Sequence, residues 1–314
     1  MSTTPKITVI ICTYNRGDLL SETLPSVFNQ NVSESKYDVI VINNNSNDST
    51  EEILINFSKS YSNLSVIKET QQGLSYARNA GYVNSTTEWI VYLDDDAMVP
   101  SDFVAIALQT IKSNKYDCFG GVYYAWYKYG KPVWFKDIYA STAEFYKQNN
   151  GHKLRYASGG IMAIKKSILI DFSGFPTHLG MKGNAMAYGE ETFLQNQMKR
   201  NGYTIGINPK WNIKHIVNKY KLSPMWFIKN GYVTGRDAWI IYEEKISFKS
   251  IVKYMLNTII TLFKKLVITT PMLFQKNYYM QNWFIEIFHP ISIQCGRVIG
   301  GLQLIFNKDK IVHK

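Results

Sequence analysis

The sequence predicts an α/β fold with a mostly parallel central sheet flanked by helices, followed by a C-terminal helical segment. Two observations support this prediction. Short apolar, β-like runs alternate with helical stretches through the first third of the chain, and such alternation is typical of a parallel sheet covered by helices on both faces. Beyond about Leu222 the pattern is mostly helical.

The expected elements follow one another closely along the chain. Strands are expected over residues 7–12, 39–42, 64–67 and 89–93. Helices are expected over residues 18–29 and 73–83, from residues 49 and 100, and from Glu190 to about residue 201. In sheets of this kind, ligands bind at the carboxyl ends of the strands. The loops after the strands are therefore where we expect a functional site.

Composition fits one large domain with an appended segment. The chain has 314 residues, of which 46% are hydrophobic, enough for a substantial core. We expect a main domain over residues 1–240 and a basic, apolar helical segment over residues 241–314. The three cysteines are widely spaced and do not show the spacing of metal ligands, which indicates free thiols in a reducing compartment. Residues 1–6 lack the apolar core of a signal peptide, so we expect a cytoplasmic protein.

The C-terminal segment is at once basic, apolar and aromatic. Residues 245–314 hold ten Lys or Arg against two acidic residues, which gives +8 of the formal net charge of +11. This composition favours an anionic membrane surface over nucleic acid as a partner. Lys264 and Lys265 interrupt the best apolar run, so the segment should lie on the inner face of the cytoplasmic membrane rather than cross it. The alternative is a helical subdomain that packs against the main domain and exposes its basic face.

Three consecutive aspartates follow the apolar run 89–93. Adjacent carboxylates repel one another and are costly to desolvate, so their place at the end of a buried strand indicates a bound divalent cation. Oxygen ligands suit Mg²⁺ or Mn²⁺, which proteins commonly hold through one or two carboxylates and substrate phosphates. We therefore expect Asp94, Asp95 and Asp96 to belong to a metal and phosphate site. An acidic, solvated turn is the alternative.

Polar side chains also follow the first two strands. Thr13, Tyr14 and Arg16 come after the first strand, and Asn44 follows the second. Because the carboxyl ends of parallel strands meet at one edge of a sheet, these side chains and the aspartates should form a single site. A nucleobase could stack on the ring of Tyr14, and the amide of Asn44 can both donate to and accept from a base edge.

These motifs resemble those of the inverting family-2 glycosyltransferases, which have a GT-A fold. The resemblance covers roughly residues 5–240 and rests on five pieces in order: residues 13–16, 44–46, 73–79, the Asp-x-Asp motif at 94–96, and residues 189–191. No Walker A or G-x-G-x-x-G sequence is present, so neither a P-loop nor a dinucleotide fingerprint is indicated. The resemblance implies a GT-A, Rossmann-like fold and a glycosyltransferase catalytic domain over residues 1–240.

The resemblance also implies roles for individual residues. Asp96 would ligate the Mn²⁺ or Mg²⁺ that bridges the donor diphosphate, and Asp94, the other half of the motif, would join it or, like Asp95, orient the ribose or the sugar. His215 would approach the diphosphate or the metal, although a lone histidine is more often structural. Arg78 would lie near the nucleotide, where a guanidinium suits bidentate phosphate contacts. A solvated arginine on a helix face is the alternative there.

Two glutamates, Glu190 and Glu191, open the later helix. The family usually has Glu-Asp at this place, with the second residue as the catalytic base, so Glu191 takes that role and Glu190 is the reserve. Acidic residues at a helix N-terminus are favoured by the helix dipole in any case. Adjacent helical residues point about 100° apart, so one carboxylate can face the site while the other does not.

The implied reaction moves a sugar from a nucleoside diphosphate, UDP or dTDP, onto a hydroxyl of a saccharide or lipid-linked saccharide, in cell-surface polysaccharide synthesis. Asn43 and Asn44 take the place of the family's Asp-Asp or Asp-Asn pair, and the lost negative charge leaves the identity of the base open. A sugar-phosphate nucleotidyltransferase is the alternative enzyme, but residues 13–16 lack the glycine-rich phosphate loop it would need. A non-catalytic basic protein that binds membranes or nucleic acid would leave the aspartates and glutamates without a purpose.

Overall fold

The computed structural model describes residues 6–149 and 154–306 and contains one eight-stranded sheet in the order β3-β2-β1-β4-β7-β6-β8-β5. The strands are β1 (Ile7–Thr13), β2 (Tyr37–Asn43), β3 (Leu64–Lys68), β4 (Trp89–Asp94), β5 (Ala97–Met98), β6 (Cys118–Trp126), β7 (Ile161–Lys165) and β8 (Ile205–Ile216). Strands β3, β2, β1 and β4 are parallel, β7 and β5 run antiparallel to their neighbours, and β6 is parallel to β8. The predicted mostly parallel sheet is therefore confirmed.

Ten α-helices accompany the sheet in the described residues. They are α1 (Gly17–Phe28), α2 (Thr50–Ser60), α3 (Leu74–Asn84), α4 (Phe103–Lys112), α5 (Thr142–Gln148), α6 (Lys166–Asp171), α7 (Glu190–Arg200), α8 (Pro224–Ile241), α9 (Phe248–Thr269) and α10 (Met280–Phe306). The expected early strands and helices are all present, with ends that differ by a few residues. The sequence pattern did not predict β5 to β8. Strand β5 has only two residues and β7 only five, and polar or aromatic residues interrupt the apolar alternation of β6 and β8.

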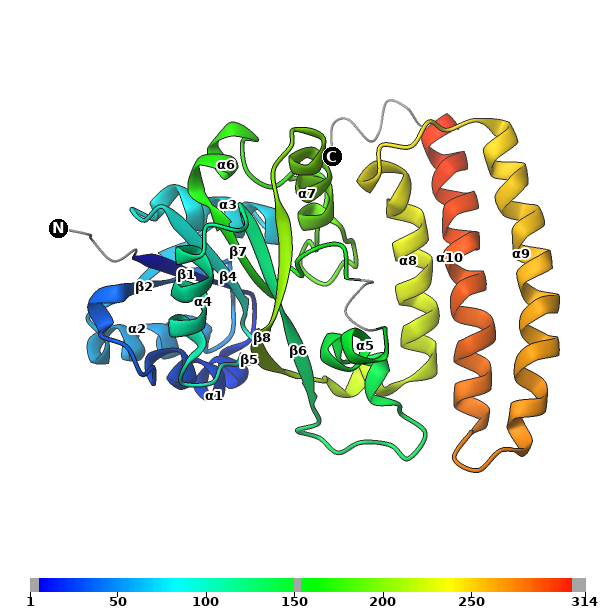
Figure 1. Cartoon of the computed structure of the whole chain (residues 1–314), viewed down its shortest axis with the longest axis horizontal. Coiled ribbons are helices and arrows are strands. Elements are labelled where there is room, and N and C mark those ends of the chain that lie inside the picture. The colour runs from blue at the N-terminus through cyan, green and yellow to red at the C-terminus, as the bar shows by residue number, and fades with distance from the viewer. Residues whose placement is uncertain (1–5, 150–153, 307–314) are drawn as a thin grey trace.

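Each face of the sheet carries its own apolar cluster, because successive side chains of a strand point to opposite faces. Ile7, Val9 and Ile11 of β1 belong to a cluster that includes residues of α1, α2 and α4. Ile10 of the same strand belongs to a second cluster, with residues of α3, α6 and α7. Helices thus cover both faces, as Figure 1 shows for α3 above β1 and β2 and for α1 and α2 below them. This arrangement leaves the carboxyl ends of β1, β2 and β4 at one edge.

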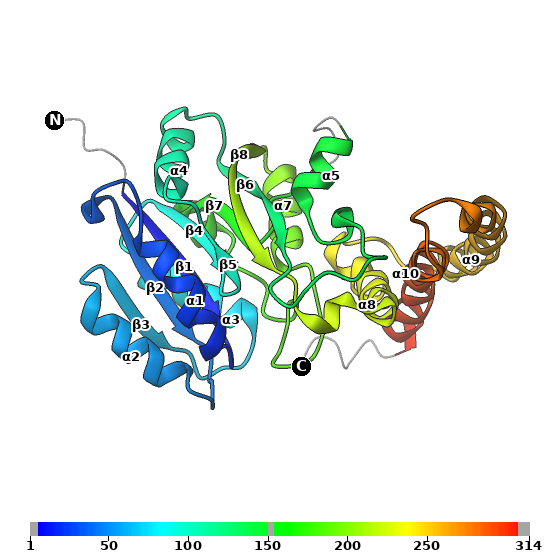
Figure 2. The ribbon, with the colours of Figure 1, turned by 90° about the horizontal axis from the view of Figure 1, so that it is seen from below.

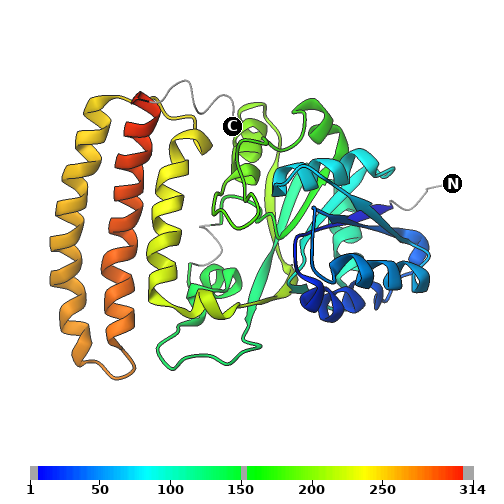
Figure 3. The same cartoon turned by 180° about the vertical axis from the view of Figure 1, so that it is seen from behind.

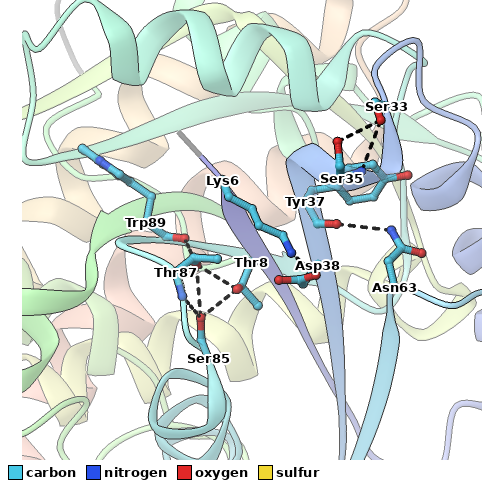
Figure 4. Close-up of polar contacts among 10 residues, drawn as sticks. All are labelled: Lys6, Thr8, Ser33, Ser35, Tyr37, Asp38, Asn63, Ser85, Thr87 and Trp89. Carbon is cyan, nitrogen blue, oxygen red and sulfur yellow. Dashed lines mark hydrogen bonds and ion pairs between the residues drawn. The ribbon is translucent and has the colours of Figure 1, made fainter. Parts of the chain in front are cut away.

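A polar network fixes the opposite end of the early strands. The hydroxyls of Thr8 and Thr87 lie 2.8 Å apart, and Ser85 donates to Thr8 at 2.7 Å (Figure 4). Ser85 is the residue that follows α3, so the network holds the end of this helix against the start of β1. Lys6 pairs with Asp38 on the neighbouring strand β2 at 2.8 Å.

The last three helices lie in a row beside the sheet, with α10 between α8 and α9 (Figures 1 and 3). Helices α8 and α10 pack with their backbones in contact. A Cβ added at Gly235 of α8 would lie 1.9 Å from the carbonyl oxygen of Ile293, and one at Gly296 of α10 would lie 2.1 Å from that of Tyr232. Helix α8 also contacts α7, so it links the sheet to the outer helices. The division of the chain at residue 240 stays a prediction.

Among the described residues, no helix combines the length and the apolar content that crossing a bilayer requires.

Candidate active site

Asp94, Asp96 and His215 form a compact cluster at the carboxyl end of β4. One ligand atom from each lies within 4.8 Å of the others. The Nε2 atom of His215 is 3.0 Å from Asp96 Oδ1 and 3.8 Å from Asp94 Oδ2. The pairing of β5 with β8 places His215 directly opposite Ala97, next to the aspartates in sequence. The structure thus brings the predicted metal-ligating residues together.

The turn that carries the aspartates is held from several directions. The backbone nitrogen of Ile216 donates to the carbonyl of Asp96 at 3.0 Å, and Asn218 Nδ2 donates to Asp96 Oδ2 at 3.4 Å. Gly160 precedes β7 and lies so close that a Cβ there would be 2.2 Å from Asp94 Oδ2. A side chain at position 160 would therefore collide with the Asp94 carboxylate.

Burial and the neighbouring charges set the protonation of the three aspartates. Burial raises the pKa of Asp94, and the nearby Asp96 raises it further. Burial and Asp96 also raise the pKa of Asp95 to about 7, although Arg16 opposes them. Asp96 is different: burial raises its pKa, but His215, Lys221 and Arg16 outweigh burial and the pKa is lowered. Asp96 is therefore the most strongly ionised carboxylate of the cluster.

A divalent cation fits the chemistry of this donor set. The two carboxylates are hard oxygen ligands of the kind that Mn²⁺ and Mg²⁺ sites use, and the imidazole is a borderline nitrogen ligand that transition-metal ions accept more readily than Mg²⁺ does. The carboxylates lie at a strand end, where substrate phosphates could supply further oxygens. Lys221 and Arg16 lie near the same carboxylates, and they are suited to contact such phosphates.

The loops after β1 and β2 are joined by hydrogen bonds. The backbone nitrogen of Asn15 donates to Ser46 Oγ at 3.0 Å, and that of Asn47 donates to Asn15 Oδ1 at 2.8 Å. Thr13 is buried, and its hydroxyl has no hydrogen-bond partner among the described residues. Tyr14 is partly buried. Burial lowers the pKa of Arg16, but the nearby Asp95 and Asp96 outweigh burial and the pKa is raised.

Asn44 is buried and organises the neighbouring loop. Its Nδ2 donates to the carbonyls of Glu69 and Gln71 at 3.1 and 2.7 Å. Its Oδ1 accepts from the backbone nitrogen of Gly73 at 2.8 Å and from Gln72 Nε2 at 3.3 Å. A carboxamide has two N–H groups and two lone pairs, and all four are used here. A contact between this side chain and a nucleobase, which stays a prediction, would require part of this network to open.

Arg78 is buried beneath the site and forms an ion pair with Glu190. The guanidinium also lies 5.3 Å from the ring centroid of Phe175 and 5.9 Å from that of Tyr92. Gly159 packs directly on the guanidinium, because a Cβ there would be 2.3 Å from one of its nitrogens. The expected contact of Arg78 with the nucleotide stays a prediction, and the structure adds an ion pair that the sequence did not suggest.

Glu191 is partly buried, whereas Glu190 is buried. Burial and Glu190 raise the pKa of Glu191 to about 8, and Arg78 opposes them. Tyr123 of β6 lies near both halves of the site: burial raises its pKa to about 12, and both Asp94 and Glu191 contribute. Glu190 and Glu191 thus differ in their surroundings, as expected of neighbouring helical residues, with Glu190 committed to Arg78.

Three residues of the site were not identified from the sequence. Asn218 donates to Asp96, Lys221 lies near the same carboxylate, and the Tyr123 ring lies 5.5 Å from that of His215. They come from β6 and from the chain after β8, where the strand pattern is weak. Only the short spacing from His215 to Asn218 and Lys221 could have drawn attention to them.

Comparison with known proteins identifies the family of this chain. A family profile described as "Glycosyl transferase family 2" matches residues 8–172, more than half of the chain. The chain belongs to glycosyl transferase family 2. The matched part of this family 2 member contains Asn44, Arg78 and the Asp-x-Asp motif, while α7 and His215 lie beyond it.

This family 2 member is similar in sequence to several known glycosyltransferases. It is 31% identical to glycosyltransferase AglE of Haloferax volcanii over 57% of the chain and 58% of that protein. It is 21% identical to the cholesterol galactosyltransferase of Borreliella burgdorferi over 98% of the chain and 81% of that protein. The match to AglE therefore spans less than two thirds of the length of that relative.

A solved structure supports the fold of the whole family 2 chain. The mannosyltransferase PcManGT from Pyrobaculum calidifontis, in complex with GDP-Man and Mn²⁺, superposes with a TM-score of 0.67 at 19% identity, covering 98% of this chain and 89% of that one. The predicted GT-A fold with a C-terminal helical segment is confirmed.

Proposed function

We propose that this chain is an inverting, metal-dependent glycosyltransferase that moves a sugar from a nucleoside diphosphate to an acceptor hydroxyl. One observation carries the proposal: the Tyr123 ring lies 5.5 Å from the ring of His215 in the Asp94, Asp96 and His215 cluster, and Glu191 is close enough to the same tyrosine to raise its pKa. Such a site offers cation ligands for a diphosphate and a separate carboxylate for a proton. Membership of family 2 and the presence of Mn²⁺ in the PcManGT complex support the same proposal.

The two parts of the site address two separate barriers of the reaction. Asp94, Asp96 and His215 would hold Mn²⁺ or Mg²⁺, which when bound neutralises charge on a leaving diphosphate. Glu191 accepts the proton of the attacking hydroxyl. A base is most effective when its pKa lies near the working pH, and a pKa of about 8 suits Glu191 to this task. Direct attack by the hydroxyl inverts the anomeric carbon and needs no covalent intermediate.

The donor nucleotide we propose is a nucleoside diphosphate, with UDP and dTDP as the first choices. The PcManGT complex contains GDP-Man, so a guanosine nucleotide belongs in the same comparison. The carboxamide of Asn44 is occupied within the protein, which makes the backbone of the loops after β1 and β2, together with Tyr14, the proposed surroundings of the base.

The acceptor we propose is a lipid-linked saccharide used in cell-surface polysaccharide synthesis. The cholesterol galactosyltransferase, whose name specifies a lipid acceptor, matches over 98% of the chain and therefore includes the C-terminal helices. A lipid carrier in the acceptor would require the enzyme to reach a membrane surface. The C-terminal helices include a face that is suited to bind such a membrane surface.

Helix α9 presents an apolar face to solvent, which supports peripheral association with an anionic membrane. Its exposed apolar residues recur at helical spacing and include Val252, Met255, Leu256, Ile259, Ile260, Phe263 and Val267. Leu256, Ile260 and Phe263 are 57%, 62% and 64% exposed. Lys249, Lys253 and Lys264 lie on the same helix. An amphipathic helix with this composition binds at the interface of an anionic bilayer.

A donor panel tests the central proposal. UDP-, dTDP- and GDP-sugars are mixed with the protein in Mn²⁺, Mg²⁺ or EDTA, and the melting temperature and the slow hydrolysis of each donor are measured. The proposal predicts that at least one donor raises the melting temperature in Mn²⁺ or Mg²⁺ and not in EDTA, and that the same donor is hydrolysed. A protein that binds none of these donors in either metal would contradict it.

A further inference from the structure

A mainly apolar groove of about 720 Å³ lies between α8 and α10 and is bounded by the loop before α7. Its lining includes Ile228, Val233, Phe288 and Ile291. The volume falls within the range of about 300–1,000 Å³ that is typical of small-molecule sites. The two helices are held by their close glycine contact, so the groove is a fixed feature of their packing.

The loop that bounds the groove leads directly to the proposed catalytic base. Ala185 and Met186 line the groove, and Glu191 follows shortly after Met186 in the chain. The loop is fastened to α8, because Arg236 Nη2 donates to the Met186 carbonyl and the backbone nitrogen of Tyr188 donates to Asp237 Oδ2, both at 3.1 Å. A molecule in the groove would therefore touch the same loop that positions the start of α7.

The groove carries one uncompensated positive charge among the residues that the structure describes. Arg236 lines it, but its guanidinium pairs with Asp237 at 2.7 and 3.1 Å. Lys229 also lines it, is exposed, and has no carboxylate within 4.0 Å in the described parts of the chain. An apolar wall with a free ammonium beside it is complementary to a hydrocarbon chain that ends in an anionic group.

We infer that this groove binds the hydrocarbon chain of the acceptor, an anionic amphiphile whose phosphate lies beside Lys229. The inference rests on the proposed function, since it names the carrier on which the acceptor saccharide is built. It explains why a mostly apolar groove adjoins the loop before α7, and why its unpaired charge is positive. The groove and the exposed face of α9 belong to the same helical layer (Figure 2), so a carrier in a bilayer could enter from that side.

A cysteine in the groove provides a direct readout. Cys295 lines the groove and is partly exposed. Farnesyl phosphate, used below its aggregation limit and without membranes, should slow the reaction of Cys295 with N-ethylmaleimide at least tenfold, as measured by peptide mass spectrometry. Farnesol should protect at least tenfold more weakly, because it lacks the charge for Lys229. Inorganic phosphate alone should give no protection, because it lacks the chain.

Matched substitutions locate the effect. Ile291→Trp, which fills the groove, should abolish protection by farnesyl phosphate, whereas Ile299→Trp on an exposed part of the same helix should leave it unchanged. Lys229→Gln should weaken protection by farnesyl phosphate about tenfold and leave that by farnesol unchanged. Lys210→Gln, an exposed lysine on β8, is the charge control. Because Lys229 is exposed, Lys229→Gln should fold normally and tests the inference even if Ile291→Trp folds poorly.

Absence of protection by farnesyl phosphate at saturating concentration would overturn the inference, and so would equal protection by inorganic phosphate. An equal loss of protection in Ile291→Trp and Ile299→Trp would overturn the inference as well. Metal-dependent hydrolysis of the sugar nucleotide is measured on the same samples. Failure of hydrolysis with intact protection would count against the proposed function, while intact hydrolysis without protection would count against the groove alone.

Discussion

The Arg78 guanidinium and the Glu190 carboxylate form an ion pair in which each side chain is only 5% exposed. The pair joins α3 to the first residue of α7, 112 positions later in the chain. Burial lowers the pKa of Arg78, but Glu190, Glu191 and Asp94 outweigh burial and the pKa is raised. This single guanidinium therefore compensates carboxylates from both parts of the proposed active site and fixes the helix that carries the base.

Arg78→Met should lower the free energy of unfolding by about 3–5 kcal/mol, because it leaves a buried carboxylate without a partner. Arg78→Met combined with Glu190→Leu should recover part of this loss. The control is Arg200→Met, which removes the exposed pair with Glu243 and should cost at most about 1 kcal/mol. Urea unfolding of the wild type and these variants measures the differences. Equal, small costs for Arg78→Met and Arg200→Met would show that the buried pair is not structural.

Asp96→Asn should abolish metal-dependent binding of the donor and retain the fold. Although it lies in a turn at a strand end, Asp96 is buried and bonded to His215 and Asn218, so asparagine is a safer replacement than alanine. Titration calorimetry with a nucleoside diphosphate and Mn²⁺ measures the loss. Asp102→Asn, a nearby exposed carboxylate, is the control. Unchanged affinity in Asp96→Asn would remove this residue from the metal site.

Glu191→Gln should lower kcat by about 10²–10⁴-fold, the usual contribution of a general base, with little change in the KM of the donor. Glu190→Gln should reduce catalysis less and stability more, because Glu190 is committed to Arg78. Steady-state kinetics and thermal unfolding of both variants measure the two effects. The opposite ranking in kcat would assign the base to Glu190.

The activity should rise with pH up to about 8. Burial and Glu190 raise the pKa of Glu191 to about 8, so the carboxylate is mostly protonated, and inactive as a base, at lower pH. Arg78 opposes this shift, and Tyr123 and Tyr242 are other titratable groups near Glu191. A pH profile of kcat/KM for the wild type measures the rise. A profile that is flat between about pH 6 and 8 would contradict the assignment.

The raised pKa of Glu191 should make the stability of the protein fall with rising pH, whereas the activity should rise. In the folded chain Glu191 holds its proton more tightly than in the unfolded chain, whose value is near 4.5. Its contribution to stability is therefore lost as pH rises from about 4.5 to about 8. Glu191→Gln lacks this contribution, so its melting temperature should fall less over that range than that of the wild type. An equal fall in melting temperature between about pH 4.5 and 8 for the two proteins would contradict the raised pKa of Glu191.

Replacing Leu256 and Phe263 by glutamate should release the protein from anionic vesicles. Both side chains are exposed on α9, and their burial in the interface would add binding that salt does not screen. Each lysine near the surface contributes about 1 kcal/mol, which falls with salt. Flotation with anionic and neutral vesicles at rising ionic strength measures this.

Ile55→Glu on exposed α2 is the control for the vesicle experiment. Point substitutions are preferable to removing the chain after residue 245, because α10 packs against α8 and its loss would uncover a buried surface. Wild-type protein that stays with the soluble fraction at low salt would contradict membrane binding and make the segment a packing or oligomerisation element. A higher mass in light scattering would then identify another copy as the partner of the apolar face.

The early strands and helices, the Asp-x-Asp motif and the resemblance to the family could all be predicted from the amino-acid sequence. These are local properties: an apolar run, a helical period or a motif can be read without knowing what lies nearby in space. Three contacts became known only from the folded chain: β8 places His215 beside Asp96, Arg78 pairs with Glu190, and the carboxamide of Asn44 is hydrogen-bonded within the protein. Each of these contacts joins residues far apart in the chain, and packing rather than local pattern selects which partners meet.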